Sequence, residues 1–132
     1  MNAIRYKGSR VSQLPLAALV VACCSFNANA QGCKHPETQL AMNRCAARDY
    51  REEDTRLNKT YRALMSKLEE VRRDSLRQVQ VAWLKFRDLQ CDLSSSGYDG
   101  GSMYPMERLS CLIEMTRERN QDLMSMLKEA GH

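Results

Sequence analysis

The cysteines are the residues of this chain whose type and number could support chemistry. Four of them, Cys33, Cys45, Cys91 and Cys111, follow an N-terminal segment with the features of an export signal. An even set of cysteines in a short exported chain is typical of disulfides, and oxidised cysteines cannot serve as nucleophiles or zinc thiolates. Four cysteines allow three pairings. Proximity in the sequence favours Cys33 with Cys45 and Cys91 with Cys111, which we take as a hypothesis.

Other signs of catalysis are weak. The chain has two histidines, His35 and His132, and no sequence pattern of a zinc protease, a P-loop or a serine hydrolase. His35 lies close to Cys33, but a metal site there competes with the disulfide that we expect. No pair of carboxylates stands out as an acid/base couple. We therefore predict a protein that is not an enzyme and that uses no metal or cofactor.

The N-terminus has the three parts of a secretory signal peptide. Basic residues precede an apolar stretch at residues 14–22, and Ala28-Asn29-Ala30 is a small-residue cleavage site. The apolar stretch is too short to span a bilayer as a helix. We predict that residues 1–30 are removed by cleavage after Ala30, leaving a single domain of residues 31–132 in the periplasm or secreted from the cell.

An alternative is a lipid anchor. Residues 20–23 loosely resemble a lipobox, and cleavage before Cys23 would leave that cysteine for lipidation. That cut would also leave Cys24 as an odd thiol, whereas cleavage after Ala30 leaves four cysteines. Cysteine parity therefore favours the unanchored form.

The net charge does not point to a polyanionic partner. The full chain carries 20 lysines and arginines against 16 acidic residues, a net of +4. Removal of Arg5, Lys7 and Arg10 with the signal leaves 17 basic residues and a net of +1. We expect neither nucleic acid nor an anionic membrane surface as a partner.

The pattern of apolar residues predicts an all-α fold, a small disulfide-stapled hairpin or bundle of three helices. Thr38 is a plausible N-cap for a long first helix, which could be bent or broken. Its apolar stripe has helical spacing and consists of Leu57, Tyr61, Leu64 and Leu68.

The second and third helices are expected on either side of a glycine- and serine-rich loop. Asp74 or Ser75 could cap the second helix, and Cys91 would end it. Its packing seam would consist of Leu76, Val79, Trp83 and Phe86, with Trp83 as a core aromatic. Pro105 suits the first turn of the third helix, whose apolar face would consist of Leu109, Leu112, Ile113, Thr116, Leu123 and Leu127.

The loop of residues 94–104 is the candidate binding element. It places tyrosines and an aspartate on a glycine-rich backbone between two helices, and binding residues often lie on loops that a rigid scaffold positions. A simple solvated connector is an equally good interpretation of its composition. The residues that we expect to contact a partner are Ser96, Tyr98, Asp99, Ser102 and Tyr104.

Three groups of residues in the chain match the pattern of one known family. The first group consists of Thr38, Gln39, Met42, Asn43, Cys45, Ala46, Tyr50, Asp54, Leu57, Asn58 and Tyr61. The second group consists of Leu76, Arg77, Gln80, Ala82, Trp83, Leu84, Phe86, Arg87, Asp88 and Cys91. The last group consists of Gly100, Gly101, Ser102, Cys111, Thr116, Arg119 and Leu123. With these residues the chain resembles the LprI-type lysozyme-inhibitor family of bacterial envelope proteins, over nearly all of residues 31–132, in order and with matching spacing.

This resemblance implies an exported helical protein that binds lysozyme and blocks hydrolysis of peptidoglycan. An inhibitor of this kind needs an element that fills the lysozyme cleft, and the loop could supply it, with Ser95 as a further hydrogen-bond donor. Asp49, Glu52, Glu53 and Asp54 could add an acidic patch. The competing function is a non-inhibitory envelope interaction protein, such as an assembly factor or the partner of a wall enzyme or effector. A bundle that binds a small ligand is disfavoured, because no polar cluster interrupts an apolar stripe.

Overall fold

Three long helices, each antiparallel to the one before it, make up the computed structural model, which describes residues 33–131. They are α2 (Gln39–Met65), α3 (Glu70–Ser95) and α4 (Tyr104–Glu129), with a short 3₁₀ helix η1 (Ser96–Tyr98) after α3. The described residues form only helices and their connections, which confirms the predicted all-α fold of three helices. None of the described helices is long and apolar enough to cross a membrane. The predicted signal peptide, cleavage site and lipid anchor lie outside the described residues.

The first helix begins where the sequence predicted and is continuous. The hydroxyl of Thr38 accepts a hydrogen bond from the backbone N–H of Ala41 at 3.1 Å, as an N-cap residue should. No break interrupts α2 before Met65. The connection to α3 is tight, and within it the N–H of Lys67 donates to the carbonyl of Leu64 at 2.9 Å.

The apolar core lies toward the end of the molecule where α2 joins α3 and α4 finishes. Buried leucines from all three helical segments meet there, namely Leu57, Leu64, Leu68, Leu76 and Leu123. Tyr61, Trp83 and Leu127 pack against them with part of their surfaces. The residues of the predicted first stripe therefore do pack in the core, although Leu68 lies in the connection after α2, and Trp83 is confirmed as an aromatic that packs on the core. Helix α2 packs mainly against α4, whereas α3 packs mainly against α4 and only lightly against α2.

The predicted packing seam of α3 is wrong in part. Leu76 is buried and Trp83 is partly buried, but Val79 and Phe86 lie on the surface, both more than half exposed. The buried face of α3 instead carries polar side chains, among them Gln80, Arg87 and Ser95. Their partners include Thr116 and Arg119 on α4, so burial on this face depends on groups distant in the sequence.

Both predicted boundaries of α3 are also wrong. The helix begins at Glu70, ahead of the expected caps Asp74 and Ser75, and its N-cap Glu69 makes no side-chain capping bond. It continues past Cys91 to Ser95, because the serine hydroxyls bond to carbonyls of the preceding turn and remain compatible with helix. Ser95 Oγ donates to the Cys91 carbonyl at 2.7 Å.

Candidate partner-binding site

The loop between α3 and α4 is a series of tight turns at one end of the molecule. The N–H of Asp99 donates to the Ser96 carbonyl at 3.2 Å, and the N–H of Gly101 donates to the Tyr98 carbonyl at 2.9 Å. Gly100 has a φ of 75°, a conformation that favours glycine. A Cβ on Gly101 would lie 3.1 Å from the Tyr98 carbonyl oxygen. The two glycines therefore allow a compact loop in which the chain reverses before α4.

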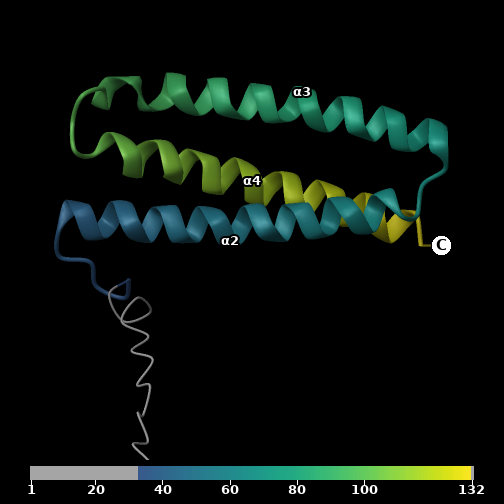
Figure 1. The fold of residues 1–132 in the computed structure, drawn as a ribbon, viewed down its shortest axis with the longest axis horizontal. Coiled ribbons are helices and arrows are strands. Elements are labelled where there is room, and N and C mark those ends of the chain that lie inside the picture. Colours follow the sequence, from purple (N-terminus) through teal and green to yellow (C-terminus); the bar gives the residue numbers. More distant parts are fainter. Residues whose placement is uncertain (1–32, 132) are drawn as a thin grey trace, which may run out of the picture.

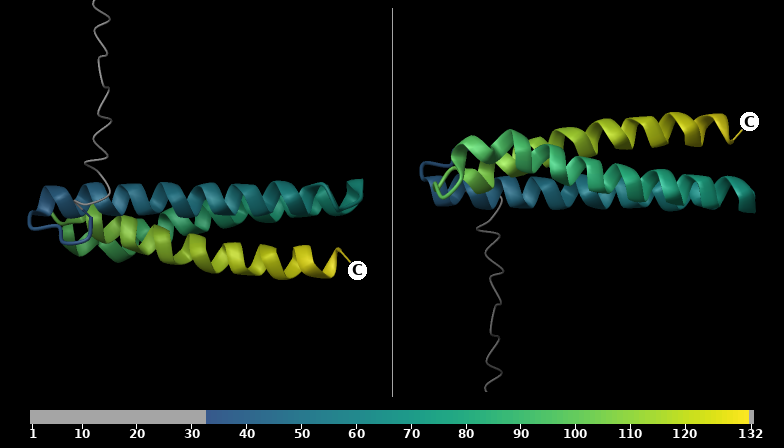
Figure 2. Two further views of the ribbon diagram at one scale, coloured as in Figure 1. Left: turned by 90° about the horizontal axis from the view of Figure 1, so that it is seen from below. Right: turned by 90° about the horizontal axis from the view of Figure 1, so that it is seen from above.

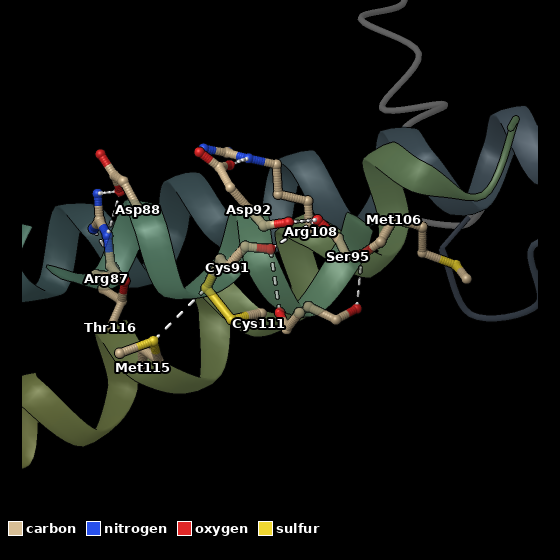
Figure 3. The surroundings of a disulfide bond; sticks show 12 residues. Arg87, Asp88, Cys91, Asp92, Ser95, Met106, Arg108, Cys111, Met115 and Thr116 are labelled. Carbon is tan, nitrogen blue, oxygen red and sulfur yellow. Dashed lines mark hydrogen bonds and ion pairs between the residues drawn. A yellow bond between two sulfur atoms is a disulfide. The ribbon is translucent and has the colours of Figure 1, made fainter. Parts of the chain in front are cut away.

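A disulfide clamps this loop at its base. Cys91 on α3 is bonded to Cys111 on α4, as the sequence predicted, and the Cys91 side chain is buried. Figure 3 shows the bond between the two helices. Nearby, Arg108 Nε donates to Asp92 Oδ1 at 2.5 Å, which adds an ion pair between the same helices. The ends of the loop are thus fixed by a covalent bond and a charge-assisted hydrogen bond.

The start of α2 also holds the loop, in addition to the bonds between α3 and α4. Asn43 Nδ2 donates to the Ser102 carbonyl at 3.0 Å, across 59 residues of sequence. The second predicted disulfide, Cys33–Cys45, is also formed and ties the segment before α2 to its second turn. Figures 1 and 2 show the start of α2 beside the α3–α4 loop at the same end of the molecule. Both disulfides therefore lie at the end that carries the candidate site.

Sequence reasoning did not identify the residues of α2 that hold the loop. Asn43 fixes the loop backbone, and Gln39 Nε2 bonds to Asn43 Oδ1 at 2.9 Å and lies 3.8 Å from Met106 Sδ. Both belong to the residues that carry the family resemblance, so their presence was visible. Their role was not, because it depends on a contact between distant parts of the chain.

The structure brings the predicted contact residues together on this loop but gives them different surroundings. Tyr98 is 41% exposed, and its hydroxyl has no hydrogen-bond partner within the described residues. The Asp99 carboxylate is also exposed and forms no ion pair there. Ser102 is exposed, whereas Tyr104 is partly buried where α4 begins. Tyr98, Asp99 and Ser102 are thus the predicted contact residues whose side chains are exposed and have no partner among the described residues.

The serines at the start of the loop are less available. Ser96 is exposed, but its hydroxyl donates to the Leu93 carbonyl at 2.7 Å and keeps only acceptor capacity. Ser95 is buried and its hydroxyl donates inside α3. The expectation that Ser95 would serve as a hydrogen-bond donor to a partner is therefore wrong.

The predicted acidic patch on α2 is wrong in part: Asp49, Glu52 and Asp54 keep exposed side chains, but Glu53 is buried. Glu53 is only 6% exposed, and its Oε1 accepts from Arg117 at 3.1 Å and Arg56 at 3.0 Å. Asp49 Oδ1 lies 2.7 Å from Arg48 Nη2. Arginines thus neutralise carboxylates that the sequence alone showed as a run of negative charge.

A buried arginine organises the middle of the molecule. Arg87 is 5% exposed, and its guanidinium lies 5.2 Å from the Trp83 ring centroid and 5.7 Å from that of Tyr50. It also donates to Asp88 Oδ1 at 2.8 Å and to Thr116 Oγ1 at 3.3 Å. Burial raises the pKa of the Tyr50 hydroxyl, although the Arg87 charge opposes this shift. The Arg87 guanidinium thus faces groups inside the fold on several sides, which gives it a role in packing.

Nothing in the described residues gathers the ligands of a metal ion. The four described cysteines are oxidised in pairs, which removes them as thiolate ligands and nucleophiles. What the loop end offers is a fixed, exposed surface with an aromatic hydroxyl and a carboxylate.

The family described as "Lysozyme inhibitor LprI" matches residues 30–123, which is most of the chain. The chain belongs to the LprI lysozyme inhibitor family. It is also 34% identical, over 131 residues, to an uncharacterised protein of Rhizobium meliloti (strain 1021), covering 86% of this chain and 94% of that relative. No solved structure matches this LprI family member.

Proposed function

We propose that this LprI family member is an exported lysozyme inhibitor that acts in the periplasm or outside the cell. The observation that carries the proposal is the stapled loop, which presents Tyr98 and Asp99 without internal partners at one end of a rigid helical rod. Membership of an inhibitor family supports the activity, and the signal-like sequence of residues 1–30 supports the location.

The chemistry of lysozyme defines what such a loop must do. Its cleft contains two catalytic carboxyl groups, one protonated and one ionised. A tyrosine hydroxyl donates well to an ionised carboxylate, and an aspartate accepts from a protonated carboxyl or from basic groups on the rim of the cleft. In this proposal Tyr98 enters the cleft and Asp99 contacts its polar groups. Substrate is then excluded by occupancy of the cleft.

The rigidity of the loop favours binding, because the conformational entropy of the loop is already lost when the inhibitor folds and is not lost again on binding. Two turns, the Cys91–Cys111 bond and the Asn43 contact fix the loop before any partner arrives. A preorganised loop loses less conformational freedom on binding than a mobile one. The near-neutral charge of residues 31–132 contributes little long-range attraction, so shape and hydrogen bonds would determine the affinity.

The test is lysozyme-driven clearing of a cell-wall suspension in the presence of the exported, oxidised protein. We expect dose-dependent inhibition by the wild type. The double substitution Tyr98→Ala, Asp99→Ala should raise the inhibitory concentration by about tenfold or more, as expected for loss of central contacts. A matched control, Met124→Ala, Glu129→Ala, removes one exposed large side chain and one carboxylate near the opposite end and should inhibit like the wild type.

Two results would count against the proposal. A folded double variant that inhibits as well as the wild type would remove the loop from the binding surface. A folded wild-type protein that inhibits no lysozyme type would refute the inhibitory function and favour the non-inhibitory envelope interaction protein.

A further inference from the structure

The outer face of α3 carries a continuous row of exposed apolar side chains. Val79, Phe86, Leu89 and Leu93 are each more than half exposed, and Leu93 reaches 70%. With Ala82, which is also exposed, they follow one another at intervals of 3, 4, 3 and 4 residues. That is the a/d spacing of a coiled-coil seam, and it runs over about 21 Å of helix. We call these five residues the outer seam.

The solvent face of α3 is unusually apolar for a surface helix. The face toward α4 mixes the polar Gln80, Arg87 and Ser95 with the apolar Leu76 and Cys91, while the solvent face carries the outer seam. A helix in a monomer usually buries its apolar stripe and exposes its charges. An apolar patch of a few hundred Å² that stays exposed on a small protein typically marks an interaction surface.

We propose that the outer seam binds the outer seam of a second copy of this chain, with the two α3 helices antiparallel. In the register that places each a position of one helix opposite a d position of the other, Leu93 of one copy faces Ala82 of its partner copy. Phe86 then faces Leu89. At each end of the contact, the large Leu93 side chain thus meets the small side chain of Ala82. The contact is isologous and closes as a two-fold dimer with its axis between Arg87 and Asp88 of the two copies.

Charges beside the seam fit this antiparallel orientation. With Val79, Phe86 and Leu93 as the a positions of the heptad, Lys85 and Asp92 both occupy g positions. The g positions of two antiparallel helices face each other. Lys85 of one copy therefore lies near Asp92 of the other, twice in the dimer. Arg108 already holds Asp92 Oδ1, which leaves Oδ2 for the lysine. In a parallel pair Lys85 would instead meet the neutral Gln90, so the charge pattern favours the antiparallel dimer.

The extent of the seam sets the strength of the dimer. A seam of five side chains on one helix is short for a specific interface, which should bury at least about 1,000 Å² in total. We therefore infer a weak dimer that dissociates on dilution. The inference does not rest on the proposed inhibition of lysozyme, because the loop and the outer seam are different surfaces.

Sedimentation velocity over a concentration series of the exported, oxidised protein tests the dimer. The wild type should shift from monomer to dimer as concentration rises, and Phe86→Glu should weaken association by about tenfold or more, because it places two carboxylates in the centre of the interface. Val81→Glu is the matched control, since Val81 is equally exposed on another side of the same helix and should leave the dimer intact.

Cysteine cross-linking tests the register. Leu93→Cys and Ala82→Cys proteins should form a mixed disulfide when combined, whereas Ala82→Cys alone should not cross-link, because its two copies would lie about 16 Å apart along the helices.

Three outcomes would overturn the proposal. One is a wild type that stays monomeric at the highest soluble concentration. Another is a Phe86→Glu variant that associates like the wild type. The third is protection of the outer seam by added lysozyme in a protein that remains monomeric, which would assign this face to lysozyme.

Discussion

At the scale of single residues, three buried polar side chains are held by partners inside the fold. Arg87 lies between two aromatic rings and bonds to α4, Glu53 is held by two arginines, and Gln80 Oε1 accepts from Arg119 at 3.1 Å. Buried polar groups are tolerated when such partners satisfy them. Contacts of this kind determine which helix faces pack together. A charged residue that carries the family resemblance, such as Arg87, can therefore have a purely structural role.

Tyr50 shows how this cluster should respond to pH. Burial raises the pKa of its hydroxyl above the ordinary value of 10.0, because the phenolate is poorly solvated beside the packed helices. The folded state therefore retains the proton more strongly than the unfolded state. The associated stability is fully present below about pH 10 and is lost as the pH rises through the folded-state pKa.

Tyr50→Phe removes this titration. We expect the free energy of unfolding of the variant to fall less steeply than that of the wild type between about pH 9 and pH 11. Urea unfolding at several pH values, followed by helical circular dichroism, measures both slopes. Tyr98→Phe removes a hydroxyl from the exposed loop and is the matched control. Equal slopes for Tyr50→Phe and the wild type would contradict the assignment.

At the scale of elements, sequence signals predicted features that depend on nearby residues. Thr38 caps α2 through a neighbour three residues away, and the glycines of the loop separate α3 from α4. Both disulfides join cysteines that are close in sequence, which is why proximity predicted them.

Features that depend on distant residues were not predicted. Hydropathy alone assigned Val79 and Phe86 to the interior of the bundle. The polar residues that take their place become satisfied only by partners on α4.

The start of α3 was also missed, because Glu69 gives no capping signal of the usual kind. For the site, sequence located the loop and its exposed Tyr98, but not the Asn43 contact that fixes the loop from α2.

The two disulfides should differ in their contribution to stability. Cys91–Cys111 links two helices over a separation of 20 residues, whereas Cys33–Cys45 links a short lead to α2 over 12. Replacing Cys91 and Cys111 by serine should lower the free energy of unfolding by about 3 kcal/mol, from loss of the constraint on the unfolded chain. The corresponding Cys33→Ser, Cys45→Ser variant should lose less, because it releases no contact between helices. Urea denaturation of both variants measures the difference, and a larger loss at Cys33–Cys45 would refute this ranking.

At the scale of the whole molecule, the two ends are stabilised by different means. Leucines from all three helices form the core toward one end, while the loop end depends on two disulfides, the Asn43 contact and the Arg108–Asp92 pair. Stability need not be uniform along such a rod, since regions with different supports can open independently. The candidate binding surface therefore depends on oxidation more than the core does.

Reduction of the disulfides should separate the two ends in a hydrogen-exchange experiment. The backbone N–H groups of Gly101 and Tyr104 are hydrogen-bonded within the loop, and reduction should speed their exchange by about tenfold or more as local opening becomes easier. Amides around Leu64 and Leu123 should remain the slowest to exchange after reduction, because the burial of these leucines does not involve cysteine. If the loop is the inhibitory surface, inhibition should weaken under the same mild reduction while helical circular dichroism persists. Uniform acceleration of exchange along the chain would instead mean that the protein opens as a single cooperative unit. The disulfides would then not stabilise the loop independently of the core.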